Sequence, residues 1–471
     1  MARPTSEWLM GKFSVFDGPV VIVGGGVAGL VTAHLLAESG AQVVVVERNG
    51  RVGGLARSFE YEGYVFDCGP HRFHTENPNI KAYIDRVLGD EVTAFPRKSE
   101  VYFEGSYYRW PLHPKNLIQL PVPLAAKSAI DLAVNGYKTY NGNSFEDYVL
   151  RQYGPTLYEN FFKGYSIKFL GIHPKDTHPD WAKVGLNRAI IDDKLQMQNL
   201  SQLAKSTLLQ FNKAEIDFTY PKTGMQLAWD RVRALVEKNG GRVVTDTKAR
   251  LIGGNGKIDA VEFGNERIQP SMVVWTAPIT LATDQLGLER PNLPYLATIF
   301  YNVLVKDVVP RDYQWCYYGA DDIVFSRASI PRFFSTETCP PGCTGLNLEV
   351  TCREGDERWR HAERLTDWVV DDLVKVGLVK SRRDVQNVYV ERVPETYPIY
   401  HSTYPKELEK TRKALASYEN LHLAGRTGMF WYNNMDHSME NAMQLSKKLL
   451  KDSGREDAEE AALAKGVARA G

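Results

Sequence analysis

The chain has 471 residues, which exceeds what one hydrophobic core usually holds and predicts two or three domains. Its 57 basic and 57 acidic residues cancel, so no overall charge favours nucleic acids or acidic membranes. No apolar run approaches the roughly 20 residues that cross a bilayer, and the first residues lack the pattern of a signal peptide. The five cysteines are scattered, which fits a reducing compartment, and none has the spacing of a zinc site. We therefore expect a cytoplasmic protein with no nucleic acid partner, no transmembrane segment and no metal.

Residues 19–56 begin with the pattern of a dinucleotide-binding unit. The apolar run 20–23 predicts a buried parallel strand, and residues 24–29 follow as a G-x-G-x-x-G turn. A helical stretch then leads to Gly40, and a second apolar run, 41–46, ends at an acid. Because strand, turn, helix, strand and acid occur in this order, nucleotide binding is favoured over an ordinary glycine-rich turn.

Individual residues of this unit have distinct expected roles. Gly24 permits the tight turn, Gly26 lets the backbone approach a pyrophosphate, and Gly29 allows the helix to pack closely on the strand. The start of the helix offers free N–H groups to a diphosphate, and the Glu47 carboxylate can accept hydrogen bonds from ribose hydroxyls. An acid at this position also disfavours a 2′-phosphate on the ribose.

A second turn of small residues, 51–56, follows the acidic strand end and contains Gly53 and Gly54. A simple NAD domain does not need this turn, whereas backbone must pass close to a larger dinucleotide; the alternative is an ordinary loop with two glycines. At this point the chain resembles the flavin amine oxidase superfamily, which includes the monoamine and protoporphyrinogen oxidases and the UDP-galactopyranose mutases. The resemblance implies FAD as the cofactor. The expected contacts in this part of the site are Gly24, Gly26, Ala28, Gly29, Glu47, Arg48, Gly54, Leu55 and Ala56.

The rest of the chain alternates helical and extended patterns. We expect strands over 61–69, a helix over 77–88, a hairpin over 95–110 that turns at 104–105, helices over 121–140 and 144–153, a helical stretch over 156–211, a loop over 219–224, a helix over 225–239, strands and tight turns over 242–276, a mostly antiparallel set over 296–393 with a helix at 363–376, a strand over 421–426 and a helix over 439–450.

This order predicts an α/β fold. It comprises a Rossmann-type, discontinuous FAD-binding domain (GR2-like) with an inserted helical and antiparallel-sheet substrate domain. The expected boundaries are 15–95, 221–290 and 415–452 for the FAD-binding domain, 96–220 for a mainly helical substrate or cap region, 291–414 for an antiparallel-sheet substrate region, and 453–471 for a flexible tail.

Residues 69–75 resemble the histidine loop that crosses the flavin in UDP-galactopyranose mutases. A histidine near a flavin can form a hydrogen bond with N5 or with the ring carbonyls and so tune its electronics. The resemblance implies that His71 is a catalytic and cofactor-binding residue. The alternative is a turn that carries two surface histidines.

Residues 157–168 resemble a mutase stretch that contains Lys-Gly-Tyr, and they imply that Tyr165 and Phe169 bind substrate. The apolar positions of this stretch are also typical of a core helix. Mutases usually carry a tryptophan near the uracil after this run, where this chain has Phe169 and Leu170. The departure leaves the identity of the base open.

Residues 322–327 resemble the mutase segment whose arginine grips the substrate diphosphate, and Arg327 matches that arginine. A guanidinium suits bidentate contact with phosphate oxygens, although an isolated arginine in a strand is also commonly solvated. The resemblance implies a catalytic and substrate-binding role for Arg327. Arg188 is a second diphosphate candidate in a segment that matches poorly.

The final motif follows a short strand near the end of the chain. Amine oxidases usually show Gly-Asp in this distal flavin turn, whereas mutases show Gly-Arg followed by Tyr and a polar residue, as this chain does. The resemblance implies cofactor contacts at Gly425, Arg426, Asn434, Met435 and Ser438 and substrate contacts at Tyr397, Tyr432 and Asn434. Neutral tyrosine hydroxyls suit a diphosphate, but each ring can also be a core residue with its hydroxyl at the edge.

The resemblance implies an FAD-dependent sugar-nucleotide mutase. In such an enzyme reduced FAD attacks the anomeric carbon through N5, and the sugar changes ring size on a flavin N5–sugar adduct. The alternatives are an FAD-dependent oxidoreductase of the amine oxidase or protoporphyrinogen oxidase type and a non-enzymatic FAD-binding scaffold. NAD(P)H is the candidate reductant, a nucleotide sugar the candidate partner, and a homodimer the candidate assembly. The sugar, the base and the redox balance stay open.

Overall fold

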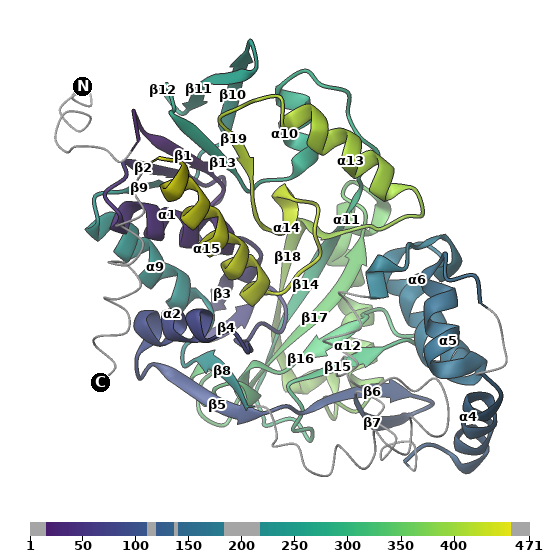
Figure 1. Ribbon diagram of the computed structural model, residues 1–471. Coiled ribbons are helices and arrows are strands. Elements are labelled where there is room, and N and C mark those ends of the chain that lie inside the picture. The colour runs from purple at the N-terminus through teal and green to yellow at the C-terminus, as the bar shows by residue number, and fades with distance from the viewer. Residues whose placement is uncertain (1–15, 111–118, 136–139, 183–216, 454–471) are drawn as a thin grey trace.

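The computed structural model describes residues 16–110, 119–135, 140–182 and 217–453 (Figure 1). A five-stranded parallel sheet, in the order β19-β13-β1-β2-β9, organises the first half of the fold. Its strands are β1 (Val20–Val23), β2 (Val43–Val46), β9 (Arg242–Val244), β13 (Met272–Trp275) and β19 (Leu421–Leu423). The sheet therefore joins the beginning, the middle and the end of the chain.

The two faces of this sheet are both covered, which explains why its three central strands, β1, β2 and β13, are unbroken apolar runs. On one face, Val20, Ile22 and Val274 pack on α1 (Val27–Glu38), α9 (Gln226–Lys238) and α15 (Met435–Asp452). On the other face, Val21 and Val273 pack on a three-stranded antiparallel sheet of β10 (Ala249–Gly254), β11 (Lys257–Phe263) and β12 (Glu266–Ile268). The alternation of side chains along each strand divides them between the two layers.

A seven-stranded sheet, in the order β18-β14-β17-β16-β15-β6-β7, forms the second half. Its strands are β6 (Ser99–Phe103), β7 (Ser106–Trp110), β14 (Tyr295–Val305), β15 (Trp315–Tyr318), β16 (Arg327–Ser329), β17 (Thr344–Cys352) and β18 (Val385–Pro398). All neighbours are antiparallel except β6 and β15. Ile299 and Val303 of β14 pack on α12 (Thr366–Lys375), while Phe300 packs near Cys68 on the opposite face.

A helical layer flanks the edge of this sheet (Figure 1). It contains α4 (Val122–Asn135), α5 (Phe145–Leu157), a π-helical turn (Tyr158–Lys163) and α6 (Gly164–Leu170). The remaining helices and hairpins include α2 (Pro78–Leu88), α10 (Ile279–Gln285), α13 (Tyr404–Leu415), α14 (Gly425–Gly428), the pair β3 (Ser58–Tyr61) and β4 (Tyr64–Asp67), and the pair β5 (Val92–Pro96) and β8 (Asp217–Pro221). Within the described ranges, no helix has both the length and the apolar character needed to cross a membrane.

The predicted α/β class and the Rossmann-type sheet are confirmed, and several local predictions hold in detail. The Asn77 side chain caps α2, Ser144 caps α5, and the hairpin of β6 and β7 turns at residues 104–105. The predicted loop over 219–224 is wrong in its first half. Residues up to Pro221 belong to β8, which pairs with β5. Pro221 is the last residue of this strand, so its missing N–H group does not interrupt the pairing.

Part of the predicted helical stretch, from residue 183, lies outside the described residues, as does the predicted tail from residue 454.

Gly29 is the residue on which the contact between α1 and the β1 turn depends. A Cβ atom at this position would lie 2.0 Å from the backbone oxygen of Gly24. We expect Gly29→Ala to lower the free energy of unfolding by at least about 3 kcal/mol, because rigid backbone has to shift. Urea denaturation measures this change. Gly18→Ala is the control: its Cβ would lie 3.7 Å from Ser271, so a loss above about 0.5 kcal/mol there would contradict the explanation.

Candidate active site

The predicted cofactor residues gather around one cavity of about 460 Å³ at the carboxyl ends of β1 and β2. Its walls include all of them except Gly29, which lies behind the turn: Gly24, Gly26, Ala28, Glu47, Arg48, Gly54, Leu55, Ala56, His71, Gly425, Arg426, Asn434, Met435 and Ser438. The first and last parts of the chain meet here because α1 and α15 pack side by side on the parallel sheet.

The shape and charge of this cavity fit a dinucleotide. A Cβ atom on Gly54 would lie 2.8 Å from the Cα atom of Gly26. The two glycine turns can therefore lie this close together at the cavity wall only because Gly54 has no side chain. Gly26 caps α1 without a side-chain hydrogen bond and no acid occupies the first turn, so the helix start presents its N–H groups to an anion. The buried Glu47 carboxylate accepts from the Gly25 N–H at 2.7 Å and the Asn49 N–H at 2.8 Å, which fixes its position at the cavity wall.

A second cavity, of about 400 Å³, lies between the helical layer and the seven-stranded sheet. Its walls are dominated by aromatic rings, namely Tyr102, Phe103, Trp110, Phe145, Phe161, Phe162, Tyr165, Phe169, Trp181, Tyr317 and Tyr432. Arg327, Glu104, Glu159 and Asp321 supply charges. The Tyr165 and Phe169 rings stack at 5.7 Å between centroids, and Trp181 stacks on Tyr432 at 4.9 Å. Such flat, apolar walls suit an aromatic ligand group.

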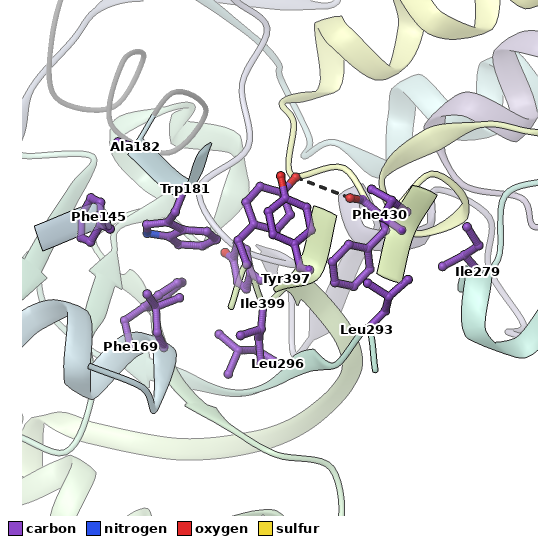
Figure 2. Packing of buried hydrophobic residues seen from close by; sticks show 14 of the residues in the cluster. Phe145, Phe169, Trp181, Ala182, Ile279, Leu293, Leu296, Tyr397, Ile399 and Phe430 are labelled. Carbon is purple, nitrogen blue, oxygen red and sulfur yellow. Dashed lines mark hydrogen bonds between the residues drawn. The ribbon is translucent and has the colours of Figure 1, made fainter. Parts of the chain in front are cut away.

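Trp181 lines the aromatic cavity, although the Lys-Gly-Tyr stretch itself has no tryptophan. It comes from the segment after α6, and its ring lies 6.2 Å from that of Phe169. Figure 2 shows Phe169, Trp181 and Tyr397 within one packed cluster, and Phe169 meets Tyr397 edge to face at 5.1 Å. No local motif marks Trp181 in the sequence, because only the return of the chain over the cavity brings it there.

Arg327 is held by a buried ion pair that sequence reasoning missed. Arg327 and Glu349 face each other across β16 and β17, and Nε and Nη2 donate to the two carboxylate oxygens at 2.7 and 2.6 Å. Nη2 also donates to the Tyr397 hydroxyl at 3.0 Å. The Glu349 side chain is fully buried, whereas 14% of the Arg327 side chain stays accessible. The Nε–Nη2 edge of Arg327 is thus already used, and Nη1 is the end left for a ligand.

His71 lines the dinucleotide cavity. Its loop passes directly against the ion pair, where a Cβ atom on Gly69 would lie 3.4 Å from Arg327 Nη2. Burial and the nearby guanidinium groups of Arg426, Arg327 and Arg72 lower the pKa of His71 to about 3. The imidazole is therefore neutral at neutral pH. Its Nδ1 lies 3.2 Å from the Gly69 carbonyl, which assigns the hydrogen to Nδ1 and leaves Nε2 as an acceptor.

The tyrosines of the site remain protonated. Burial raises the pKa of Tyr165, Tyr397 and Tyr432 above the usual value, even though Arg327 opposes the shift at all three. Because the Tyr397 oxygen accepts from Arg327, its own O–H hydrogen is directed elsewhere. These hydroxyls can donate to an anion without adding fixed charge.

The other predicted residues are divided between the cavities. Arg426 donates to the backbone oxygens of Thr396 and Asn433 and its guanidinium lies over the Tyr432 ring. Asn434 lies at the dinucleotide cavity, where it caps α15, and it is not among the residues that line the aromatic cavity. Arg188 lies outside the described residues.

Loss of the Glu349 charge tests how far the site depends on the ion pair. We expect Glu349→Gln to lower the free energy of unfolding by about 3–5 kcal/mol, because Arg327 keeps a largely buried charge without its counter-ion. Urea denaturation measures the loss. In the control, Glu266→Gln breaks a more exposed pair with Arg242 and should cost below about 1 kcal/mol. Equal losses in the two variants would refute a special role for the buried pair.

Three comparisons with known proteins agree with this architecture. Residues 22–87 match the family model of the NAD(P)-binding Rossmann-like domain. A probable UDP-galactopyranose mutase of Klebsiella pneumoniae is 30% identical over 167 residues, which is 33% of this chain and 42% of that protein. A dTDP-fucopyranose mutase of Escherichia coli is 29% identical over 163 residues, 33% of this chain and 43% of that protein. The chain thus spans less than half the length of the curated mutases that it matches.

Solved structures extend the similarity to nearly the whole chain. Reduced UDP-galactopyranose mutase superposes with a TM-score of 0.78 at 22% identity, covering 92% of this chain and 95% of that one. Wild-type putrescine oxidase gives 0.60 at 15% identity, covering 92% and 99%. The resemblance inferred from the sequence is confirmed. The chain has the fold shared by UDP-galactopyranose mutase and putrescine oxidase. Along 33% of the chain, its sequence is also similar to the sequences of sugar mutases.

Proposed function

We propose that this protein is an FAD-dependent mutase that interconverts the pyranose and furanose forms of a nucleoside-diphosphate sugar. The observation that carries the proposal is the junction of the two cavities. There, Arg426 of the dinucleotide cavity lies over the Tyr432 ring of the aromatic one, and the charge of Arg327, which donates to Tyr397, acts on the neutral His71. A nucleotide sugar has an aromatic base, a diphosphate and a sugar in sequence, and this order matches aromatic walls, then hydrogen-bond donors, then the cofactor cavity.

FAD would be held by the two glycine turns, by Glu47 and by the starts of α1 and α15. When bound in its reduced form, FAD supplies the nucleophilic N5 through which a sugar can change ring size. The role of the chain's own residues would be to position and bind the substrate. Nη1 of Arg327 and the hydroxyls of Tyr397 and Tyr432 would donate to the diphosphate, which stabilises it both as a bound group and as a leaving group.

His71 would act as a fixed neutral group in this site. Its Nδ1–H is committed to the Gly69 carbonyl, so Nε2 would accept a hydrogen bond from the cofactor or from a sugar hydroxyl. A low pKa keeps the imidazole uncharged beside the guanidinium groups. The neutral imidazole would therefore orient a ligand without adding a charge of its own to the site. Tyr165, Phe169 and Trp181 would hold the base, although Phe169 and Leu170 in place of the usual tryptophan leave its identity open.

The same proposal includes a nucleotide sugar as partner, NAD(P)H as reductant, a homodimeric assembly and a cytoplasmic location. The cofactor would bind to the discontinuous unit of residues 15–95, 221–290 and 415–452.

The cofactor assignment has a direct test. We expect the purified protein to be yellow and to release FAD into the supernatant when it is precipitated with acid, because no cysteine among the described residues lines the cavity. Absorbance and mass spectrometry of the supernatant identify the flavin. Colour that stays with the pellet would contradict non-covalent binding, and a protein that binds only NAD would refute the proposal.

The reaction type has a separate test. A mutase should need a reduced flavin yet consume no reductant beyond the amount that first reduces the flavin. An oxidase instead consumes one equivalent of an electron acceptor for each molecule of product. We expect dithionite-reduced protein to yield a ring-size isomer from a nucleotide sugar, and cyanoborohydride added during turnover to leave a flavin whose mass is increased by that of the sugar. Chromatography and mass spectrometry measure both.

Because the identity of the nucleotide base is open, both UDP sugars and dTDP sugars should be tried as substrates. Hydrogen peroxide formed in proportion to a consumed amine, with no isomer from any nucleotide sugar, would favour the oxidoreductase instead.

A further inference from the structure

Phe430 has a backbone conformation that a bulky residue rarely adopts. Its φ angle is 50°, in the left-handed region that favours glycine, and its side chain is buried. Such a conformation is strained and persists only where surrounding contacts hold it. The strain bears on the site because Tyr432, two residues further on, lines the aromatic cavity.

The Tyr400 side chain holds this turn on both sides of Phe430. Its hydroxyl oxygen accepts a hydrogen bond from the Tyr432 N–H at 2.8 Å, and the hydroxyl donates to the Phe430 carbonyl oxygen at 3.5 Å. Burial raises the pKa of Tyr400 to about 12, so the hydroxyl keeps its hydrogen at neutral pH. One hydroxyl group therefore makes both contacts that bracket the strained residue.

Tyr400 is also attached to the segment that carries Trp181. Its carbonyl oxygen accepts a hydrogen bond from the His178 N–H at 2.7 Å. The Tyr404 ring stacks on the Tyr400 ring at 4.2 Å between centroids, and the Tyr404 hydroxyl donates to the Asp180 carboxylate at 2.7 Å. Two hydrogen bonds thus fix the segment immediately before Trp181.

Trp181 and Tyr432 form one wall of the aromatic cavity. Their rings stack at 4.9 Å between centroids, although the two residues lie far apart in the sequence. The Tyr400 ring meets Trp181 edge to face at 6.2 Å, and the Tyr400 hydroxyl contacts the backbone of Tyr432. Tyr400 itself lines neither of the two cavities. It can therefore affect a ligand only through the residues that it holds.

We propose that Tyr400 is a positioning residue for substrate binding. It holds the strained turn that carries Tyr432 and the segment that carries Trp181, so that the two rings stack as one wall. Tyr404 supports this arrangement through its hydrogen bond to Asp180. The inference rests on the proposed function, because it needs a nucleotide that binds beside these rings.

The test removes one oxygen atom at a time from the FAD-loaded protein. Tyr400→Phe loses the hydroxyl that holds the turn, and Tyr404→Phe loses the hydrogen bond to Asp180. The matched control is Tyr301→Phe. Tyr301 is also buried and lines neither cavity, and its hydroxyl donates to the Ala362 carbonyl oxygen at 2.7 Å. Calorimetry measures the affinity for UDP and for dTDP, urea denaturation the stability, and absorbance the flavin content.

Tyr400→Phe should bind the nucleoside diphosphate about 5- to 20-fold more weakly than the wild type, because both rings of the wall lose support. Tyr404→Phe should weaken binding by a smaller factor, since it loosens only the segment that carries Trp181. The Tyr301→Phe control should bind within about twofold of the wild type, while its urea midpoint falls about as far as that of Tyr400→Phe. Flavin content should stay unchanged in all three variants.

A double-mutant cycle with Trp181→Leu separates positioning from a general loss of stability. If Tyr400 acts through the stacked wall, Tyr400→Phe should weaken binding by a clearly smaller factor once the indole is gone. A merely structural role would give the same factor in both backgrounds.

The inference is overturned if Tyr400→Phe binds as tightly as the wild type, if Tyr301→Phe weakens binding equally, or if the cycle shows no coupling. Should Tyr400→Phe not fold, Tyr404→Phe decides by the same criteria. A wild type that binds neither UDP nor dTDP would instead refute the proposed function, and this inference with it.

Discussion

The ion pair between Arg327 and Glu349 is the interaction on which the rest of the site depends. It bridges two adjacent strands, and Arg327 also donates a hydrogen bond to the hydroxyl of Tyr397 on a third strand. The pair supports the histidine loop through the close approach of Gly69. Because Glu349 is fully buried, the pair is stable only while both charges and their hydrogen bonds are present. The pair therefore fixes the relative positions of groups that come from four separate parts of the chain.

This arrangement also sets the electrostatic character of the junction. Glu349 neutralises Arg327, and the guanidinium groups of Arg426, Arg327 and Arg72 all lie near His71. Burial and these charges together keep His71 neutral. Since the protein has no overall field to attract an anion, a local cluster of this kind is the way in which such a chain binds one.

The aromatic cavity draws its rings from segments that lie far apart in the sequence. The position after Lys-Gly-Tyr lacks the expected tryptophan, yet the stacked pair of Trp181 and Tyr432 brings an indole to the same cavity. Phe169 and Tyr397 pack against each other beside it. The aromatic surface of this cavity is thus built from different segments of the chain.

The sequence by itself determined the dinucleotide cavity and the α/β class, because turn, helix start and strand end are set by residues adjacent in the chain. Gly24, Gly26 and Glu47 lie within one βαβ unit, so their spacing alone brings them together. Only the tertiary structure decided the partner of Arg327 and the contribution of Trp181 to the aromatic cavity. Those contacts depend on strand register and on the packing of distant segments, and no local pattern encodes which side chains then meet.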